Sequence, residues 1–143
     1  MTRPGEALAG AAEALVGTPF RLHGRDPATG LDCIGLVGTA LAACGYRVHV
    51  PEGYGLRNAR IDRFLAFAPR NGLHPATGPT LPGDIVLTAP GPAQHHLMIA
   101  LGTARAVHAH AGLRRTVAQT FPTPFHALRR WRIGANPEQT WQR

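Results

Sequence analysis

Cys33 and four downstream histidines are the residues whose types and spacing could do chemistry. A cysteine nucleophile reacts as the thiolate, and it needs a base that takes its proton and a further group that fixes the tautomer of that base. Histidine can fill both of these supporting roles. His95 and His96 are adjacent, and His108 and His110 follow soon after, so one hairpin could bring the two pairs together. The sequence therefore predicts nucleophilic catalysis by Cys33 with histidines as its partners.

The segment around Cys33 indicates a buried helix that begins at this cysteine. Asp32 has the side chain of a helix N-cap, the following residues are almost wholly apolar, and Gly45 closes the segment. At the helix N-terminus, unpaired N–H groups and the positive end of the dipole should lower the pKa of the Cys33 thiol. Cys44 would lie about 16 Å further along the helix, whereas a disulfide needs Cα atoms within ~7 Å. We expect two free thiols, with Cys44 a packing residue.

Strand periodicity leaves the choice among the histidines open. His95 and His96 would point to opposite faces of one strand, so only one of them can face the thiol. His108 and His110 point the same way, so either could orient the base. A zinc site formed by Cys33, His96, His108 and His110 is chemically conceivable. Without a paired C-x-x-C or an H-E-x-x-H spacing, however, we expect no metal and no cofactor.

The elements that must position these residues change in type along the chain. The pattern predicts a helix over 4–16 ended by Gly17, a loop over 18–30, the buried helix over 33–44, an irregular stretch over 47–55, a short helix over 61–68 and turns over 69–83. Short strands separated by Gly or Pro follow at 84–88, 95–101, 106–110, 113–119 and 126–133 and indicate an antiparallel meander. Helices followed by strands predict an α+β fold. The remaining histidines, His23, His49, His74 and His126, fall in expected loops or on the surface, and the tail after Gly134 is expected to fray.

Length and composition exclude several classes of protein. With 143 residues, of which 44% are hydrophobic and 16% charged, the chain is too apolar for disorder and has the size of a single domain over 1–143. Its 17 Gly and 13 Pro argue against a helical bundle or a coiled coil. No apolar run approaches the ~20 residues that span a bilayer, and no signal-peptide core is evident. We therefore expect synthesis in the cytoplasm and no membrane insertion.

The net charge of +7 comes from 15 arginines and 8 acidic residues, because the chain contains no lysine. Such a charge favours association with anionic partners. The arginines are scattered, and no recognition-helix pattern, zinc-finger spacing or aromatic-interleaved basic stripe accompanies them. Nucleic-acid binding is the weaker alternative, and we expect no specific nucleic-acid partner.

Five segments together resemble the NlpC/P60 family of cysteine peptidases. The stretches GTPF at 17–20 and GLDCIGLV at 30–37 are similar to the family's G-x-P-Y opening and its D-C-S-G-L-V nucleophile motif. PGDIVL at 82–87 resembles the G-D-L-V-F strand, HLMIALG at 96–102 the H-V-G-I-Y-L-G strand, and AVHA at 106–109 the I-H-A strand. The resemblance extends from about Gly17 to Ala111, which is most of the chain, and the segments follow the family's order.

The resemblance implies a papain-like α+β fold in which N-terminal helices, with the nucleophile at a helix N-terminus, pack on an antiparallel sheet. It further implies that Cys33 is the nucleophile, that His96 is the general base and then the acid, and that His108 orients His96. The family motif places the catalytic histidine six residues before the Gly that ends its strand, here Gly102, and this selects His96 over His95.

Several positions depart from the family pattern around the expected substrate site. Phe20 replaces a tyrosine whose hydroxyl helps to line the site, and His23 stands in place of one glycine of a Gly-Gly pair. The loop to Cys33 is one residue longer, Ile34 replaces the usual serine, and Met98 replaces a glycine. We expect Phe20, Arg21, His23 and Asp32 to lie around the oxyanion and substrate pocket, with the backbone N–H of Cys33 as one oxyanion donor and His23 or Arg21 replacing the lost phenol in part.

The loop over 22–33 is similar to that of a phage-tail subgroup, which includes peptidases encoded by gene transfer agents. The resemblance implies an endopeptidase that cleaves peptidoglycan stem peptides between γ-D-glutamate and the diamino acid, carried on a phage-like tail into the cell envelope, with a tail hub or baseplate protein as partner. One alternative is a structural tail component in which Phe20 and Met98 mark a decayed site. The other is amidase or acyl-transfer chemistry on the same three residues.

Overall fold

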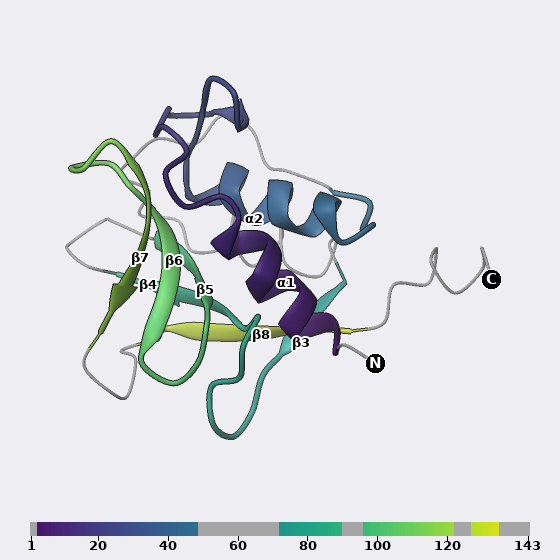
Figure 1. The fold of residues 1–143 in the computed structure, drawn as a ribbon. Helices are drawn as coiled ribbons and strands as arrows, with labels where there is room; N and C mark the ends of the chain where they lie inside the picture. The colour runs from purple at the N-terminus through teal and green to yellow at the C-terminus, as the bar shows by residue number, and fades with distance from the viewer. Residues whose placement is uncertain (1–2, 49–71, 90–95, 122–126, 135–143) are drawn as a thin grey trace.

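The computed structural model describes residues 3–48, 72–89, 96–121 and 127–134 (Figure 1). The helix expected over 61–68 lies outside the described residues, as do most of the stretch 47–55 and the tail after Gly134. The same is true of His49, His95 and His126.

Two helices form where the sequence predicts them. Helix α1 covers Pro4–Glu13 and begins with proline, whose fixed φ suits the first helical position. It ends three residues earlier than expected because the N–H groups of Leu15 and Val16 bond to the carbonyls three residues back, which tightens the chain into a turn. Gly17 follows in the left-handed region, with φ 96°. Helix α2 covers Cys33–Ala43 with Asp32 as its N-cap, so the prediction that Cys33 begins a helix is confirmed.

A six-stranded antiparallel sheet occupies the second half of the chain. Its spatial order is β3-β8-β4-β5-β6-β7, where the strands are β3 (Leu73–Pro75), β4 (Ile85–Thr88), β5 (His96–Ala100), β6 (Arg105–His110), β7 (Arg115–Thr120) and β8 (Arg129–Ile133). The five strands expected from the sequence are all present with shifted ends. The expected simple meander holds only for β4 to β7, because β8 returns to lie between β3 and β4. Strand β3 was not expected, since its segment is rich in turn residues.

A small hairpin lies within the stretch expected to be a loop. Strands β1 (Arg25–Asp26) and β2 (Gly30–Leu31) pair antiparallel, and the Asp26 carboxylate accepts a hydrogen bond from the turn. Isolated bridges pair Phe20 with Leu31 and Pro19 with Arg115. The loop before α2 is therefore bonded on one side to β2 and on the other to β7.

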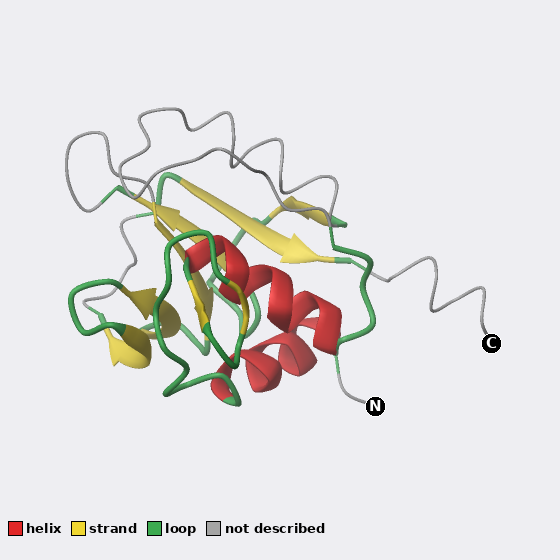
Figure 2. Cartoon of the chain, turned by 90° about the horizontal axis from the view of Figure 1, so that it is seen from above, coloured by secondary structure: helices red, strands yellow, loops and turns green. Residues whose placement is uncertain are grey.

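Both helices pack on one face of the sheet, and the main core lies between them (Figures 1 and 2). Leu8 of α1 and Val37 of α2 are fully buried there against residues of the sheet such as Ile99. A smaller cluster of Val86, Met98, Ala100 and Ala106 covers the opposite face. The alternation along β5, with Leu97 and Ile99 in one cluster and Met98 and Ala100 in the other, matches the period of two expected for a strand.

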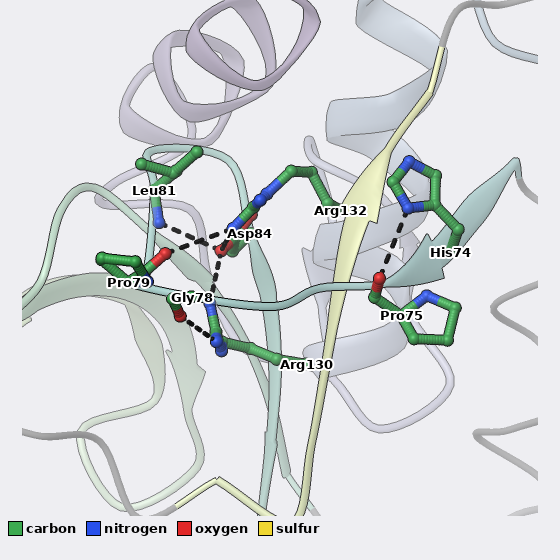
Figure 3. Close-up of polar contacts among 8 residues, drawn as sticks. All are labelled: His74, Pro75, Gly78, Pro79, Leu81, Asp84, Arg130 and Arg132. Atoms are coloured by element: carbon green, nitrogen blue, oxygen red, sulfur yellow. Dashed lines mark hydrogen bonds and ion pairs between the residues drawn. The ribbon is translucent and has the colours of Figure 1, made fainter.

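A buried carboxylate fastens β8 to the loop that precedes β4 (Figure 3). Asp84 accepts hydrogen bonds from the Leu81 N–H at 3.0 Å, from Arg130 at 3.0 Å and from Arg132 at 2.9 Å through two nitrogens. The two guanidinium groups also donate to carbonyls at 78–79. Asp84 is fully buried, so these four bonds compensate the desolvation of its charge.

Candidate active site

The buried side chain of Asp32 holds the end of α2 where Cys33 lies. Its Oδ1 accepts a hydrogen bond from the Gly35 N–H at 2.8 Å, as an N-cap should, and its Oδ2 accepts one from the His23 N–H at 2.8 Å. The Arg25 guanidinium donates to Oδ1 at 3.1 Å. Asp32 is only 2% exposed, so the structure places it as a cap that joins the preceding loop to the helix.

Two glycines allow this loop to lie directly against the helix. A Cβ atom at Gly35 would collide with the carbonyl oxygen of Gly24, and one at Gly24 would collide with that of Gly30. His23 has φ 62°, in the left-handed region that favours glycine, at the position where the family resemblance expects a glycine. The approach of the loop backbone to the first turn of α2 therefore fixes the surroundings of Cys33.

The Cys33 thiol is held against the start of β5. The backbone N–H groups of Leu97, Ile34 and Cys33 itself form hydrogen bonds to the sulfur that lower its pKa. Cys33 keeps some exposed surface as a residue, yet burial of the thiol outweighs these bonds and raises its pKa to about 12. The N–H groups at the helix N-terminus thus lower the pKa of Cys33 as expected, but the expected net lowering is wrong. Desolvation of the thiolate, to which the negative charge of Asp32 adds, is the larger effect.

His96 and His108 form a hydrogen-bonded pair on neighbouring strands. His96 is the first residue of β5, next to Leu97, and its Nε2 lies 2.9 Å from Nδ1 of His108 on β6. The two rings meet edge to face, with centroids 5.1 Å apart and an interplanar angle of 83°. The His110 ring lies 5.4 Å from that of His108 and accepts a hydrogen bond from the Leu113 N–H. Of the two histidines on β6, His108 is thus the one hydrogen-bonded to His96.

Both rings of this pair favour the neutral form. Burial, together with the proximity of His108 and His110, lowers the pKa of His96 to about 4. The pKa of His108 is also lowered, mainly by burial, although its hydrogen bond to Gln119 acts in the opposite direction. At neutral pH the Cys33 thiol and the His96 imidazole are therefore both in their uncharged forms.

Gln119 is hydrogen-bonded to the same pair, and no motif in the sequence singles it out. Its Oε1 lies 2.7 Å from Nε2 of His108, so three side chains from β5, β6 and β7 are linked in a row. The register pairs Ala106 with Gln119 and His108 with Val117, which makes Gln119 the diagonal neighbour of His108 on the same face. Only the register of the β6–β7 hairpin could have singled out this glutamine.

The other residues expected around the substrate lie on the loop before α2. Phe20 is half-buried and its N–H bonds to the Arg114 carbonyl, while Arg21 and His23 are exposed. His74, expected at the surface, is exposed on β3. Among the described residues, no three His, Cys, Asp or Glu side chains are arranged so that they could hold a metal ion. Within the same ranges, none of the helices has the length and apolarity to cross a membrane.

The fold, with two helices packed on an antiparallel sheet and the cysteine at a helix N-terminus, is the papain-like α+β class expected from the resemblance. A family model described as "NlpC/P60 family" matches residues 17–127, which is most of the chain. The chain therefore belongs to the NlpC/P60 family. Members of this family are typically cysteine peptidases that hydrolyse peptidoglycan, and membership indicates that class of activity.

Solved structures agree with the family assignment at the level of the fold. The NlpC/p60 domain of the peptidoglycan hydrolase SagA is 24% identical with a TM-score of 0.56, over 81% of this chain and 88% of that one. The P60 domain of an antigen from M. avium subspecies paratuberculosis is 22% identical with a TM-score of 0.57, over 91% and 94%.

NlpC2 from Trichomonas vaginalis is 19% identical with a TM-score of 0.66, and the match covers 92% of this chain but 49% of that one. The present chain thus spans about half the length of this larger relative. A comparison with curated proteins found no match.

Proposed function

We propose that this protein is a cysteine endopeptidase that hydrolyses peptidoglycan stem peptides, with Cys33 as the nucleophile, His96 as the general base and acid, and His108 as the residue that orients His96. The observation that carries the proposal is the His96–His108 hydrogen bond of 2.9 Å beside the helix that begins at Cys33. The family assignment supplies the reaction class, and no metal or cofactor takes part.

The reaction starts from the neutral pair. As the Cys33 sulfur bonds to the carbonyl carbon of the scissile amide, its proton moves to His96. The tetrahedral intermediate then breaks its C–N bond, and His96 returns the proton to the leaving amine. A water molecule then attacks the thioester carbon while His96 takes one of its protons. The resulting tetrahedral intermediate breaks its C–S bond, His96 returns the proton to the sulfur, and the carboxylic acid is released. Because desolvation disfavours the charged forms of both groups, the proton moves to His96 together with formation of the C–S bond and not before it.

Oxyanion stabilisation is assigned to the backbone N–H of Cys33, at the positive end of α2. Phe20 has no hydroxyl to offer, so we assign the second contribution to Arg21 or His23 on the adjoining loop. Replacing each by alanine tests this assignment. Unchanged turnover in His23→Ala would remove His23 from it.

The bond cleaved and the place of action are also part of the proposal. We assign hydrolysis to the bond between γ-D-glutamate and the diamino acid. We also assign the protein to a phage-like tail, with a hub or baseplate protein as partner and the cell envelope as the site of action. The resemblance of residues 22–33 to tail-borne members and the net charge of +7, which suits an anionic wall or an acidic partner surface, support this assignment. Mass spectrometry of purified phage-like particles would test whether they contain this protein.

The decisive experiment is digestion of purified peptidoglycan with mass spectrometry of the released fragments. Cys33→Ala should abolish hydrolysis while preserving the fold by circular dichroism, and Cys44→Ala, which removes the other thiol, should retain full activity. Full activity of Cys33→Ala would refute the proposed nucleophile. Release of whole stem peptides from the glycan would indicate an amidase instead, and no hydrolysis by the wild type would favour a structural tail component.

A further inference from the structure

Gln119 makes a contact that defines the protonation of the two histidines. Its Oε1 accepts and cannot donate, so the bond of 2.7 Å requires a hydrogen on Nε2 of His108. A neutral imidazole carries one hydrogen, and Nδ1 of His108 is then a bare acceptor. The bond of 2.9 Å between this Nδ1 and Nε2 of His96 must therefore be donated by His96. The one hydrogen of neutral His96 is thus on Nε2.

This assignment decides which nitrogen of His96 can act as a base. With its hydrogen on Nε2, neutral His96 has its lone pair on Nδ1, and only this atom can take a proton from a thiol. If the hydrogen bond between the two rings ran in the opposite direction, His108 would carry its hydrogen on Nδ1 and donate it to His96. The hydrogen of neutral His96 would then have to be on its own Nδ1. His96 would then be unable to accept a proton at the atom that is not engaged with His108.

We propose that Gln119 is a positioning residue, which fixes the tautomer of His108 through its Oε1 and thereby leaves Nδ1 of His96 free to act as the base. The proposal rests on the proposed function of His96. Gln119 acts through two other side chains and lies on β7, two strands away from β5.

The surroundings explain why a neutral acceptor is suited to this position. Among the described residues, the titratable groups facing His108 are His96 on β5 and His110 on its own strand, and Phe121 packs against the ring at a centroid distance of 5.5 Å. On β7, the charged Arg115 is paired with His110 in the register. A carboxylate in place of Gln119 would favour the imidazolium form of His108, which carries a hydrogen on both nitrogens and opposes donation from His96.

The test compares Gln119→Leu, Gln119→Glu and the control Thr120→Val, which changes the next exposed residue of β7. Nitrogen NMR of isotope-labelled histidine reports the tautomers without any need for activity. The wild type and Thr120→Val should carry the His108 hydrogen on Nε2, and Gln119→Leu should lose this preference. A hydrogen on Nδ1 of His108 in the wild type, or an unchanged tautomer in Gln119→Leu, would overturn the proposal.

Kinetics on a stem-peptide substrate give a second readout. A net hydrogen bond is worth about a 3- to 10-fold change in rate, so kcat of Gln119→Leu should fall by about that factor. KM should stay unchanged, because the proposed role of Gln119 is exerted through His108. Gln119→Glu should recover kcat at about pH 8 and move the acidic limb of the kcat profile to higher pH as His108 protonates more readily. A limb that stays in place would contradict the proposal. If the wild type shows the expected tautomers but hydrolyses no stem peptide, the proposed function is refuted and the role of Gln119 in fixing the tautomer is not.

Discussion

Acidification should destabilise this protein through His96, in a pH range where carboxylates contribute little. The pKa of His96 is lowered from 6.5 to about 4 in the folded state, so between these values the unfolded chain binds the proton more readily than the folded one. The free energy of unfolding therefore rises with pH across this window. The contribution is fully present above pH 6.5 and is lost as the pH falls toward 4.

The magnitude follows from the two pKa values. A difference of one pKa unit corresponds to about 1.4 kcal/mol, so the whole shift is worth about 3 kcal/mol. The part that titrates between about pH 7.5 and about pH 5 is about 2 kcal/mol. This contribution is a large share of the roughly 5–15 kcal/mol that stabilise a typical domain.

Urea unfolding at the two pH values measures the effect, with His96→Gln as the test variant. The wild type should lose about 2 kcal/mol more than His96→Gln between about pH 7.5 and about pH 5. His74→Gln, which removes an exposed histidine from β3, serves as the control and should behave like the wild type. An equal loss in the wild type and His96→Gln would refute the argument that burial of this ring lowers its pKa.

Three further predictions follow from the buried contacts. In a Cys44→Ala background, the Cys33 thiol should react slowly with iodoacetamide near neutral pH and faster only above pH 9, because its pKa is raised to about 12. Rapid alkylation near neutral pH would contradict this prediction. Gly35→Ala should lower the free energy of unfolding by about 3 kcal/mol, because the new Cβ meets the Gly24 carbonyl; a change within about 0.5 kcal/mol would show that the loop yields easily. Asp84→Asn should cost about 3 kcal/mol in chemical denaturation, since two arginines of β8 lose a buried charged partner, and an unchanged midpoint would show that solvent replaces it.

Local patterns were enough to predict the main elements and the position of Cys33 at the start of a helix. The apolar run after Asp32 and the glycine at its end are properties of a few consecutive residues, and they set the limits of α2 to within one residue. The strands of the meander could be found for the same reason, because alternation and turn residues are local. The position of β8 could not be found, since its pairing with β3 and β4 joins segments far apart in the chain.

The sequence by itself determined which residue types are available for catalysis, the family resemblance and the start of the helix at Cys33. The tertiary structure decided their chemical state. Burial against β5 raises the pKa of Cys33 where the helix dipole alone would lower it, because desolvation depends on what packs around the thiol. The link from His96 through His108 to Gln119 likewise depends on strand register, which places one side chain within 2.7 Å of another and which spacing along the chain does not specify.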